Sequence, residues 1–257
     1  MSELVTQPVD ALRGLAELRR VAIVPALNEE NTVPRVIDEL RAFDPGLDVV
    51  VVDDGSTDRT AEVAAARGAK VLRLPFNLGI GGAVQTGFRF AYENGYDLAV
   101  RVDADGQHDP SQLPRILEPV LRGDADIAVG SRFADENGDG YRSSRSRRIG
   151  IRILAWVVSR IAGQRVTDTT SGFQVLNRSG IALFARDYPH DYPEVEAAVM
   201  VFRHRLRLVE VPVSMRERGG GRSSITALRS IYYMVKVLLA IFVGLFRRTV
   251  VPEEDKR

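Results

Sequence analysis

The sequence contains no cysteine, which excludes disulfide bridges, thiolate nucleophiles and zinc sites built on cysteine. Its formal net charge is only +1, so the chain as a whole has no strong attraction to nucleic acid. No internal repeat is present. Residues 1–20 are polar and include no long apolar stretch, so we expect an N-terminal extension and not a secretory signal.

Positive charge is nevertheless concentrated in two blocks. Between Tyr141 and Arg152 there are five arginines and no acidic residue, and between Arg216 and Arg248 there are seven basic residues and one acidic residue. Basic blocks beside apolar sequence indicate an anionic surface or ligand. Solvated helix faces are the alternative explanation for each block.

The longest apolar run covers residues 231–246 and is interrupted only by Lys236 and Gly244. As a helix it would be about 24 Å long, which is shorter than a hydrocarbon core of about 30 Å. Two arginines follow it at once. We therefore predict a membrane-associated, interfacial or shallowly inserted helix within a C-terminal segment of residues 226–257. A buried core helix is the alternative.

Short β-rich runs alternate with amphipathic segments along the rest of the chain. This alternation predicts an α/β fold with a doubly wound, mostly parallel sheet and helices on both faces. The expected domain covers residues 21–225. The expected strands are 21–27, 48–54, 70–75, 97–105, 126–132 and 206–215, and the expected helices are 30–43, 59–67, 81–94, 110–121 and 149–161.

Polar residues gather where four of these strands end. Ligands of open α/β sheets bind outside the carboxyl ends of the strands, so this edge is the expected site. The residues at these ends are Asn28, Glu29, Asp53, Asp54, Asp103, Asp105, Ser131 and Arg132.

The pair Asp103 and Asp105 predicts a metal site. Residues two apart in a strand point the same way, so the two carboxylates would converge. Carboxylate oxygens suit Mg²⁺ or Mn²⁺, with phosphate oxygens completing the coordination. Gln107 and His108 lie within reach. A solvated Asp-Gly turn is the alternative, and a calcium-binding EF-hand is excluded because its twelfth position would be Pro114.

Two further segments suit a nucleotide. The run Asp53–Asp58 offers carboxylates to a base or a ribose, although a capped turn before a helix would also explain it. Gly79 to Gly82 opens a helix after the third strand and could bind phosphate through backbone N–H groups. Several arginines could bind a donor diphosphate and an acceptor phosphate, or anionic lipid head groups. They are Arg132, the arginines of 142–152, Arg216, Arg218 and Arg222.

Five motifs in this order resemble family 2 glycosyltransferases of the GT-A fold. Within that family the chain looks most like the dolichyl- or polyprenyl-phosphate mannose or glucose synthases. The motifs are Val24-Pro25-Ala26-Leu27-Asn28-Glu29-Glu30, Val52-Asp53-Asp54-Gly55-Ser56-Thr57-Asp58, Asn77-Leu78-Gly79-Ile80-Gly81, Asp103-Ala104-Asp105-Gly106-Gln107-His108 and Gly130-Ser131-Arg132.

The resemblance implies a metal-dependent, inverting transfer of a hexose from a GDP- or UDP-linked donor to a polyprenyl or dolichyl phosphate. It implies that Mg²⁺ or Mn²⁺ is held by Asp103, Asp105 and Gln107. The implied catalytic residues are Asp105, Arg132, Arg218 and Arg222. The implied acceptor contacts are Arg132, Ser171, Gly172 and Ser223. The nucleotide would lie against Pro25, Ala26, Asn28, Glu29, Asp53, Asp54, Gly79, Asp103 and Ala104.

The chain departs from the family in two respects. Many relatives carry a lysine where this chain has Ser224, and its C-terminal segment is shorter than the paired spanning helices of some relatives. Arg222 could substitute for the missing lysine. The expected location is the cytoplasmic face of the plasma membrane, with a small membrane-protein partner or a homo-oligomer as further options and no nucleic acid.

The acceptor stays open at this stage. A lipid phosphate is already ionised and needs orientation more than a general base. A hydroxyl acceptor of a polysaccharide or another cell-envelope polymer would need a carboxylate base, for which Asp168, Glu194 and Glu196 are the candidates. A non-catalytic nucleotide-binding module at a membrane is a third hypothesis.

Overall fold

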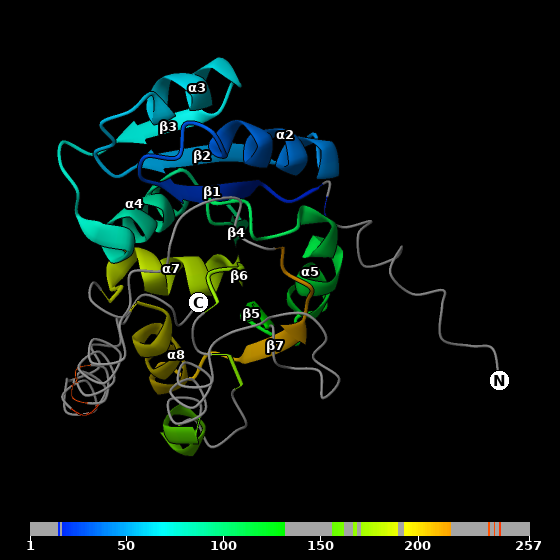
Figure 1. Ribbon diagram of the computed structural model, residues 1–257. Helices are drawn as coiled ribbons and strands as arrows, with labels where there is room; N and C mark the ends of the chain where they lie inside the picture. Colours follow the sequence, from blue (N-terminus) through cyan, green and yellow to red (C-terminus); the bar gives the residue numbers. More distant parts are fainter. Residues whose placement is uncertain are drawn as a thin grey trace.

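The computed structural model describes residues 15, 17–131, 156–161, 167–168, 171–189 and 193–216, together with 236, 239 and 242. Within these residues the strands form one seven-stranded sheet in the order β3-β2-β1-β4-β6-β5-β7 (Figure 1). The strands are β1 (Arg20–Ala26), β2 (Asp48–Asp53), β3 (Lys70–Arg73), β4 (Leu98–Arg101), β5 (Ile127–Ser131), β6 (Gln174–Asn177) and β7 (Leu208–Pro212).

The sheet is mostly parallel, as the sequence predicted. β1 pairs in parallel with β2 and β4, β2 with β3, and β5 with β7. The exception is β6, which the sequence pattern did not predict. It lies between β4 and β5 and runs antiparallel to both.

Helices cover both faces of the sheet, which confirms that prediction too. Residues of β1 alternate between two cores, with Val21 and Ile23 packing on one face and Ala22 and Val24 on the other. The helices are α2 (Val33–Phe43), α3 (Thr60–Ala66), α4 (Gly79–Glu93), α5 (Leu113–Leu121), α7 (Arg178–Arg186) and α8 (Pro193–Arg203), and a 3₁₀ turn, Pro110–Gln112, precedes α5.

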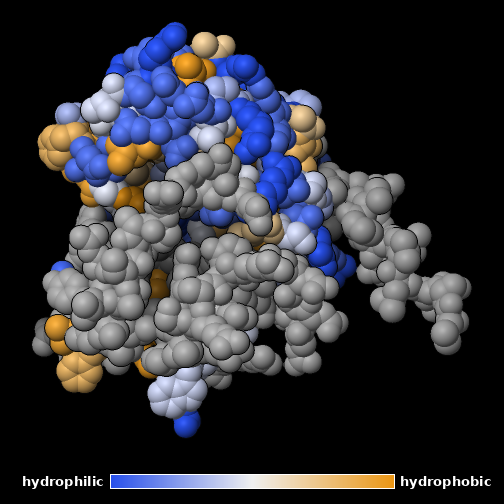
Figure 2. All heavy atoms as spheres, viewed as in Figure 1, coloured by the Kyte–Doolittle hydropathy of each residue, from blue (hydrophilic) through white to orange (hydrophobic). Residues whose placement is uncertain are grey.

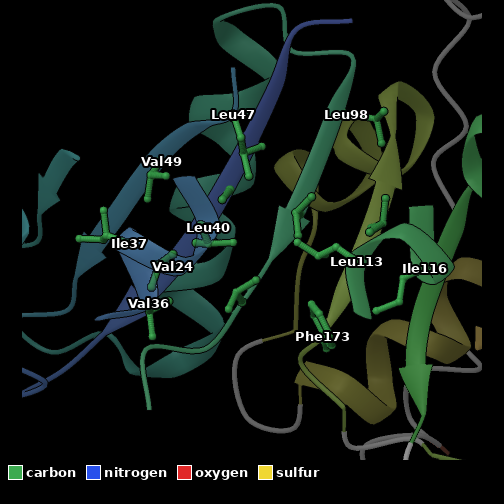
Figure 3. Packing of buried hydrophobic residues seen from close by; sticks show 14 of the residues in the cluster. Val24, Val36, Ile37, Leu40, Leu47, Val49, Leu98, Leu113, Ile116 and Phe173 are labelled. Carbon is green, nitrogen blue, oxygen red and sulfur yellow. The ribbon is translucent and has the colours of Figure 1, made fainter. Parts of the chain in front are cut away.

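One core lies between the sheet and the helices α4, α7 and α8. The other lies under α2, α3 and α5. Figure 3 shows Ile37 and Leu40 of α2 and Leu113 and Ile116 of α5 in this second core. With both faces buried, the edge of the sheet is the surface left for a ligand.

The fourth strand is shorter than predicted, and this corrects the geometry expected for the acidic pair. β4 ends at Arg101, and residues 104–106 form a turn. The turn is closed by Gly106 at φ +74° and by a 3.0 Å hydrogen bond from the Gln107 amide to Asp105 Oδ1. The prediction that Asp103 and Asp105 point the same way because they belong to a strand was therefore wrong.

The predicted C-terminal helix lies largely outside the described residues. Of residues 231–246 only Lys236, Leu239 and Phe242 are described, and the latter two are more than half exposed. No helix in the described part of the chain has the length and apolar character needed to cross a bilayer. In the view of Figure 2, hydrophilic side chains cover most of the described surface around α2, α3 and β3.

Candidate active site at the carboxyl edge of the sheet

The loops after β1 and β2 are held together by hydrogen bonds at the carboxyl edge. Asn28, whose backbone has φ +56°, accepts a 2.8 Å hydrogen bond from the Thr57 amide through its side-chain oxygen. The Glu29 amide donates to Thr60 Oγ1 at 2.8 Å. Pro25 and Ala26 are buried just before these loops, whereas the Glu29 side chain is half-buried. The residues at the end of β1 that are predicted to bind the nucleoside therefore lie beside the loop that follows β2.

Both acidic residues at the end of β2 are buried. Asp54 accepts hydrogen bonds from the amides of Leu78 and Gly79, at 2.7 and 3.0 Å, and so satisfies the first turn of α4. Asp53 accepts a 3.0 Å hydrogen bond from the Ser56 amide. One of the amides expected to bind phosphate at the start of α4, that of Gly79, thus already bonds to a carboxylate of the protein. A contact of Asp54 with the nucleoside stays a prediction.

The loop after β4 carries Asp103 and Asp105, and we call it the acidic loop. It places Asp103 among basic and aromatic groups. Asp103 Oδ1 lies 3.5 Å from Arg101 Nη2, and Oδ2 lies 3.8 Å from His108 Nε2. The Asp103 amide donates to His108 Nδ1 at 3.1 Å, which makes that nitrogen an acceptor. The His108 ring stacks on Phe173 with 4.8 Å between centroids. Asp103, Asp105 and Gln107 are half-buried, and Ala104 is buried.

The antiparallel strand β6 brings the predicted acceptor loop against this acidic loop. Gln174, the first residue of β6, pairs with Arg101, the last residue of β4. Ser171 and Gly172 therefore enter at the carboxyl edge, where both are buried. A Cβ atom on Gly172 would lie 2.7 and 2.8 Å from the two carboxylate oxygens of Asp103. Any side chain at position 172 would therefore displace the Asp103 carboxylate from its present position.

The segment after β7 also reaches the acidic loop. Met215 forms an antiparallel bridge with His108, and the Arg216 amide donates to the Gln107 carbonyl at 2.8 Å. Arg216 forms ion pairs with Glu39 at 2.7 Å and with Asp109 at 3.0 Å. Its hydrogen bond with Glu39 raises the pKa of the guanidinium. Arg216 is thus engaged by two carboxylates of the protein.

The other predicted phosphate ligands lie outside the described residues. They are Arg132, Arg218, Arg222, Ser223 and the arginines of 142–152. Their roles stay predictions.

The candidate bases differ in their surroundings. Asp168 is buried, and its amide donates to Glu210 Oε1 at 2.7 Å. It borders a cavity of about 20 Å³, room for about one water molecule, together with Ser171 and Gln174. Glu196 is half-buried on α8, and the Glu194 side chain is not among the described atoms.

The acidic loop fits a divalent metal ion that is shared with a phosphorylated ligand. In the described part of the chain no group of three or more histidine, aspartate or glutamate side chains could hold a metal by itself. Mg²⁺ is commonly held by one or two carboxylates together with substrate phosphates and water. Asp103 and Asp105 supply that minimal set.

The sequence reasoning missed Arg101, the largest fully buried side chain of the described chain. Its Nη1 lies 3.0 Å from the hydroxyl of buried Tyr188. The available signal was one charged residue inside the apolar run Leu98-Ala99-Val100-Arg101-Val102.

Comparison with known proteins identifies the family. The model of Glycosyl transferase family 2 matches residues 21–184. The undecaprenyl-phosphate mannosyltransferase of Micrococcus luteus is 34% identical over 224 residues, which cover 81% of this chain and 88% of that protein. The polyprenol monophosphomannose synthase of Mycolicibacterium smegmatis is 31% identical over 229 residues, 85% of each chain.

A solved structure supports the fold. Glucosyl-3-phosphoglycerate synthase from Mycobacterium tuberculosis, in complex with Mn²⁺, UDP-glucose and phosphoglyceric acid, matches with a TM-score of 0.72 and 23% identity. The match covers 97% of this chain and 87% of that one. Together with the motifs along the carboxyl edge, these similarities show that the chain belongs to glycosyl transferase family 2 and is a hexosyltransferase.

Proposed function

We propose that this glycosyltransferase moves a hexose from a nucleotide-sugar to a polyprenyl phosphate, with inversion at the anomeric carbon and with a divalent metal ion. The observation that carries the proposal is the contact between Asp103 and Gly172, which joins the acidic loop to the loop expected to face the acceptor. The names of the two relatives support a polyprenyl-phosphate acceptor.

The nucleotide would bind where β1 and β2 end. Pro25, Ala26, Asn28 and Glu29 would line one side of the nucleoside. Asp53, Asp54, Gly79 and Ala104 complete the predicted nucleotide set. The hydrogen bonds between the β1 and β2 loops support this role, because they fix the pocket before a ligand arrives and reduce the entropy lost on binding.

Asp103 and Asp105 would hold Mg²⁺ or Mn²⁺, with Gln107 beside them. When bound, such an ion withdraws negative charge from the departing diphosphate as a Lewis acid. The hydrogen bond from the Gln107 amide to Asp105 and the turn at Gly106 keep this loop in one conformation. The half-buried position of both carboxylates limits the water around them, which strengthens their electrostatic interactions.

The acceptor phosphate would approach from the side of Ser171 and Gly172. It needs orientation and not deprotonation, because one of its oxygens is already anionic. Arg132, Arg218, Arg222 and Ser223 are the proposed phosphate contacts, with the three arginines and Asp105 as the catalytic residues. Asp168 is buried, and its amide donates a hydrogen bond to Glu210. Both observations support a structural role for Asp168 in this proposal.

The lipid acceptor places the reaction at a membrane surface. We assign the catalytic domain to residues 21–225, after an extension of residues 1–20, and membrane association at the cytoplasmic face to residues 226–257. Leu239 and Phe242, exposed by 59% and 58%, support that assignment.

The test is a product assay with purified full-length protein. GDP-mannose, UDP-glucose and UDP-N-acetylglucosamine are each incubated with a polyprenyl phosphate in Mn²⁺, Mg²⁺ or EDTA. We expect one donor to give a sugar-lipid, EDTA to prevent it, and Asp105→Asn to abolish it. Asp38→Asn, at an exposed pair with Arg67, is the matched control and keeps full activity.

Two results would contradict the proposal. One is a sugar-lipid formed equally well in EDTA, which would remove the metal from the mechanism. The other is transfer only to a soluble hydroxyl acceptor, lost in Asp168→Asn or Glu196→Gln, which would establish the alternative acceptor class.

A further inference from the structure

Arg101 is a buried cation directly beneath the acidic loop. Only 1% of its side chain is exposed, and it stands at the last position of β4. Sequence reasoning assigned it no role. Its position raises the question of why a charge is retained in an otherwise apolar strand.

The guanidinium connects two groups at once. Nη1 lies 3.0 Å from the Tyr188 hydroxyl, and Nη2 lies 3.5 Å from Asp103 Oδ1. Tyr188 is itself buried, and its ring packs against Phe184 of α7 at 4.9 Å between centroids. The guanidinium is therefore anchored on the α7 side of the sheet and directed toward Asp103 at the carboxyl edge.

Fold stability does not explain such an arrangement well. The desolvation of the buried guanidinium offsets much of its attraction to the half-buried Asp103 carboxylate, and apolar replacements of buried charges are often as stable. A fixed orientation of Asp103 is the property that an apolar residue could not supply. Gly172 closes the opposite side, since a Cβ there would lie 3.0 Å from Arg101 Nη2 and closer still to the Asp103 carboxylate.

We propose that Arg101 is a positioning residue, which together with Tyr188 fixes the Asp103 carboxylate for the metal–diphosphate complex. This inference rests on the proposed function, because it takes Asp103 as a metal ligand. Arginine is required here because its planar guanidinium reaches Tyr188 and Asp103 through different nitrogens. A lysine has one nitrogen and cannot hold both with the same geometry.

The experiment measures Mn²⁺ binding by electron paramagnetic resonance of the free ion, with GDP and with UDP, on full-length protein. Removing a side chain that bonds to a metal ligand typically lowers metal affinity by about 10- to 100-fold. We expect Arg101→Met to raise the Kd for Mn²⁺ by about that factor. Arg101→Lys and Tyr188→Phe should give smaller increases. Nucleotide affinity without metal should change less than about twofold, because no nucleotide contact is removed.

Arg20→Met is the matched control. Arg20 forms a largely buried pair with Asp44 at the start of β1, remote from the acidic loop along the sheet. This variant should lower the melting temperature and leave the Kd for Mn²⁺ unchanged. The comparison distinguishes the general effect of removing a buried arginine from the specific effect of removing Arg101.

Each outcome decides the inference. A folded Arg101→Met variant with wild-type Mn²⁺ affinity would overturn it while leaving the proposed metal site intact. If Arg101→Met does not fold, unchanged Mn²⁺ affinity in both Arg101→Lys and Tyr188→Phe would overturn it. Wild-type protein that binds no Mn²⁺ with either nucleotide would instead overturn the metal site itself, and this inference with it.

Discussion

Arg216 lies 2.7 Å from Glu39, although 177 positions separate the two residues in the sequence. The pair ties the segment after β7, the last described strand, to α2, the first described α-helix. Arg216 also bonds to Asp109, so the same guanidinium holds the loop that follows the acidic pair. A basic residue that suggested phosphate binding thus joins three parts of the site.

Arg216→Met should destabilise the fold and change the titration of Asp109. Burial raises the pKa of Asp109, but hydrogen bonds from Ser111 and the charge of Arg216 hold it below its usual value. Without the arginine we expect that pKa to rise, as measured by NMR titration, and unfolding to cost about 1 kcal/mol less, since solvent screens these partly exposed pairs. Arg67→Met, at an exposed pair with Asp38, should change stability by less than about 0.5 kcal/mol. An unchanged Asp109 titration would show that the pair does not form in solution.

Gly172→Ala should abolish transfer while the protein remains folded. The new methyl group would lie within 2.8 Å of both Asp103 carboxylate oxygens, so the Asp103 side chain must leave its present position. We expect kcat to fall at least about 100-fold, since misplacement by about 1 Å has that effect. Gly180→Ala, which crowds Ile127 and Leu176 instead, is the control and should lose stability but keep kcat per folded molecule. Normal kcat in Gly172→Ala would contradict the contact.

Asp54→Ala should weaken the fold as well as the nucleotide site. It leaves the Leu78 amide without its acceptor, whereas the Gly79 amide keeps a 2.8 Å hydrogen bond to Asn77 Oδ1. Losing a hydrogen bond of this partly exposed kind costs about 0.5–1.5 kcal/mol, so urea denaturation should show a loss in that range. Calorimetry of the folded variant then reports nucleotide binding separately. If stability is unchanged, Asp54 does not support the start of α4.

Acid should remove the contribution of the pair Arg20 and Asp44. The hydrogen bond from Arg20 holds the pKa of Asp44 below its usual value, despite partial burial. A carboxyl whose pKa is lowered by folding stabilises the protein above its unfolded pKa of about 3.9, and loses this effect as the pH falls through the folded pKa. Asp44→Asn should therefore be less stable than wild type at pH 7, with a difference that shrinks below about pH 4. Denaturation curves at several pH values measure it, and a difference that grows toward low pH would reverse the sign of our argument.

Local sequence predicted much of this fold because its signals act over a few residues. Val49 to Val52 is continuously apolar and forms a strand buried on both faces. The spacing of Val33, Val36, Ile37 and Leu40 gives α2 its buried side. The polar residues after β1, β2 and β4 had to meet, because parallel strands carry their ends to one edge.

The extent of β4 was not predictable in the same way. Asp103 and Asp105 follow an apolar run and have the spacing of a strand face, yet the backbone turns after Val102. Gly106 adopts a positive φ, and the bond from the Gln107 amide to Asp105 competes with a ladder bond. Side chains of this kind favour turns over strands when a glycine is available.

The sequence by itself determined the family, the class of fold and the edge of the sheet that carries the site, because these depend on motifs and on short-range patterns of apolar residues. Only the tertiary structure decided that β6 enters antiparallel between β4 and β5, which sets Gly172 against Asp103. It likewise decided that Arg101 lies buried beneath the acidic loop and that Arg216 is held by Glu39. Each of these contacts joins distant parts of the chain or depends on how the sheet packs, and no local pattern specifies which partners the folded chain brings together.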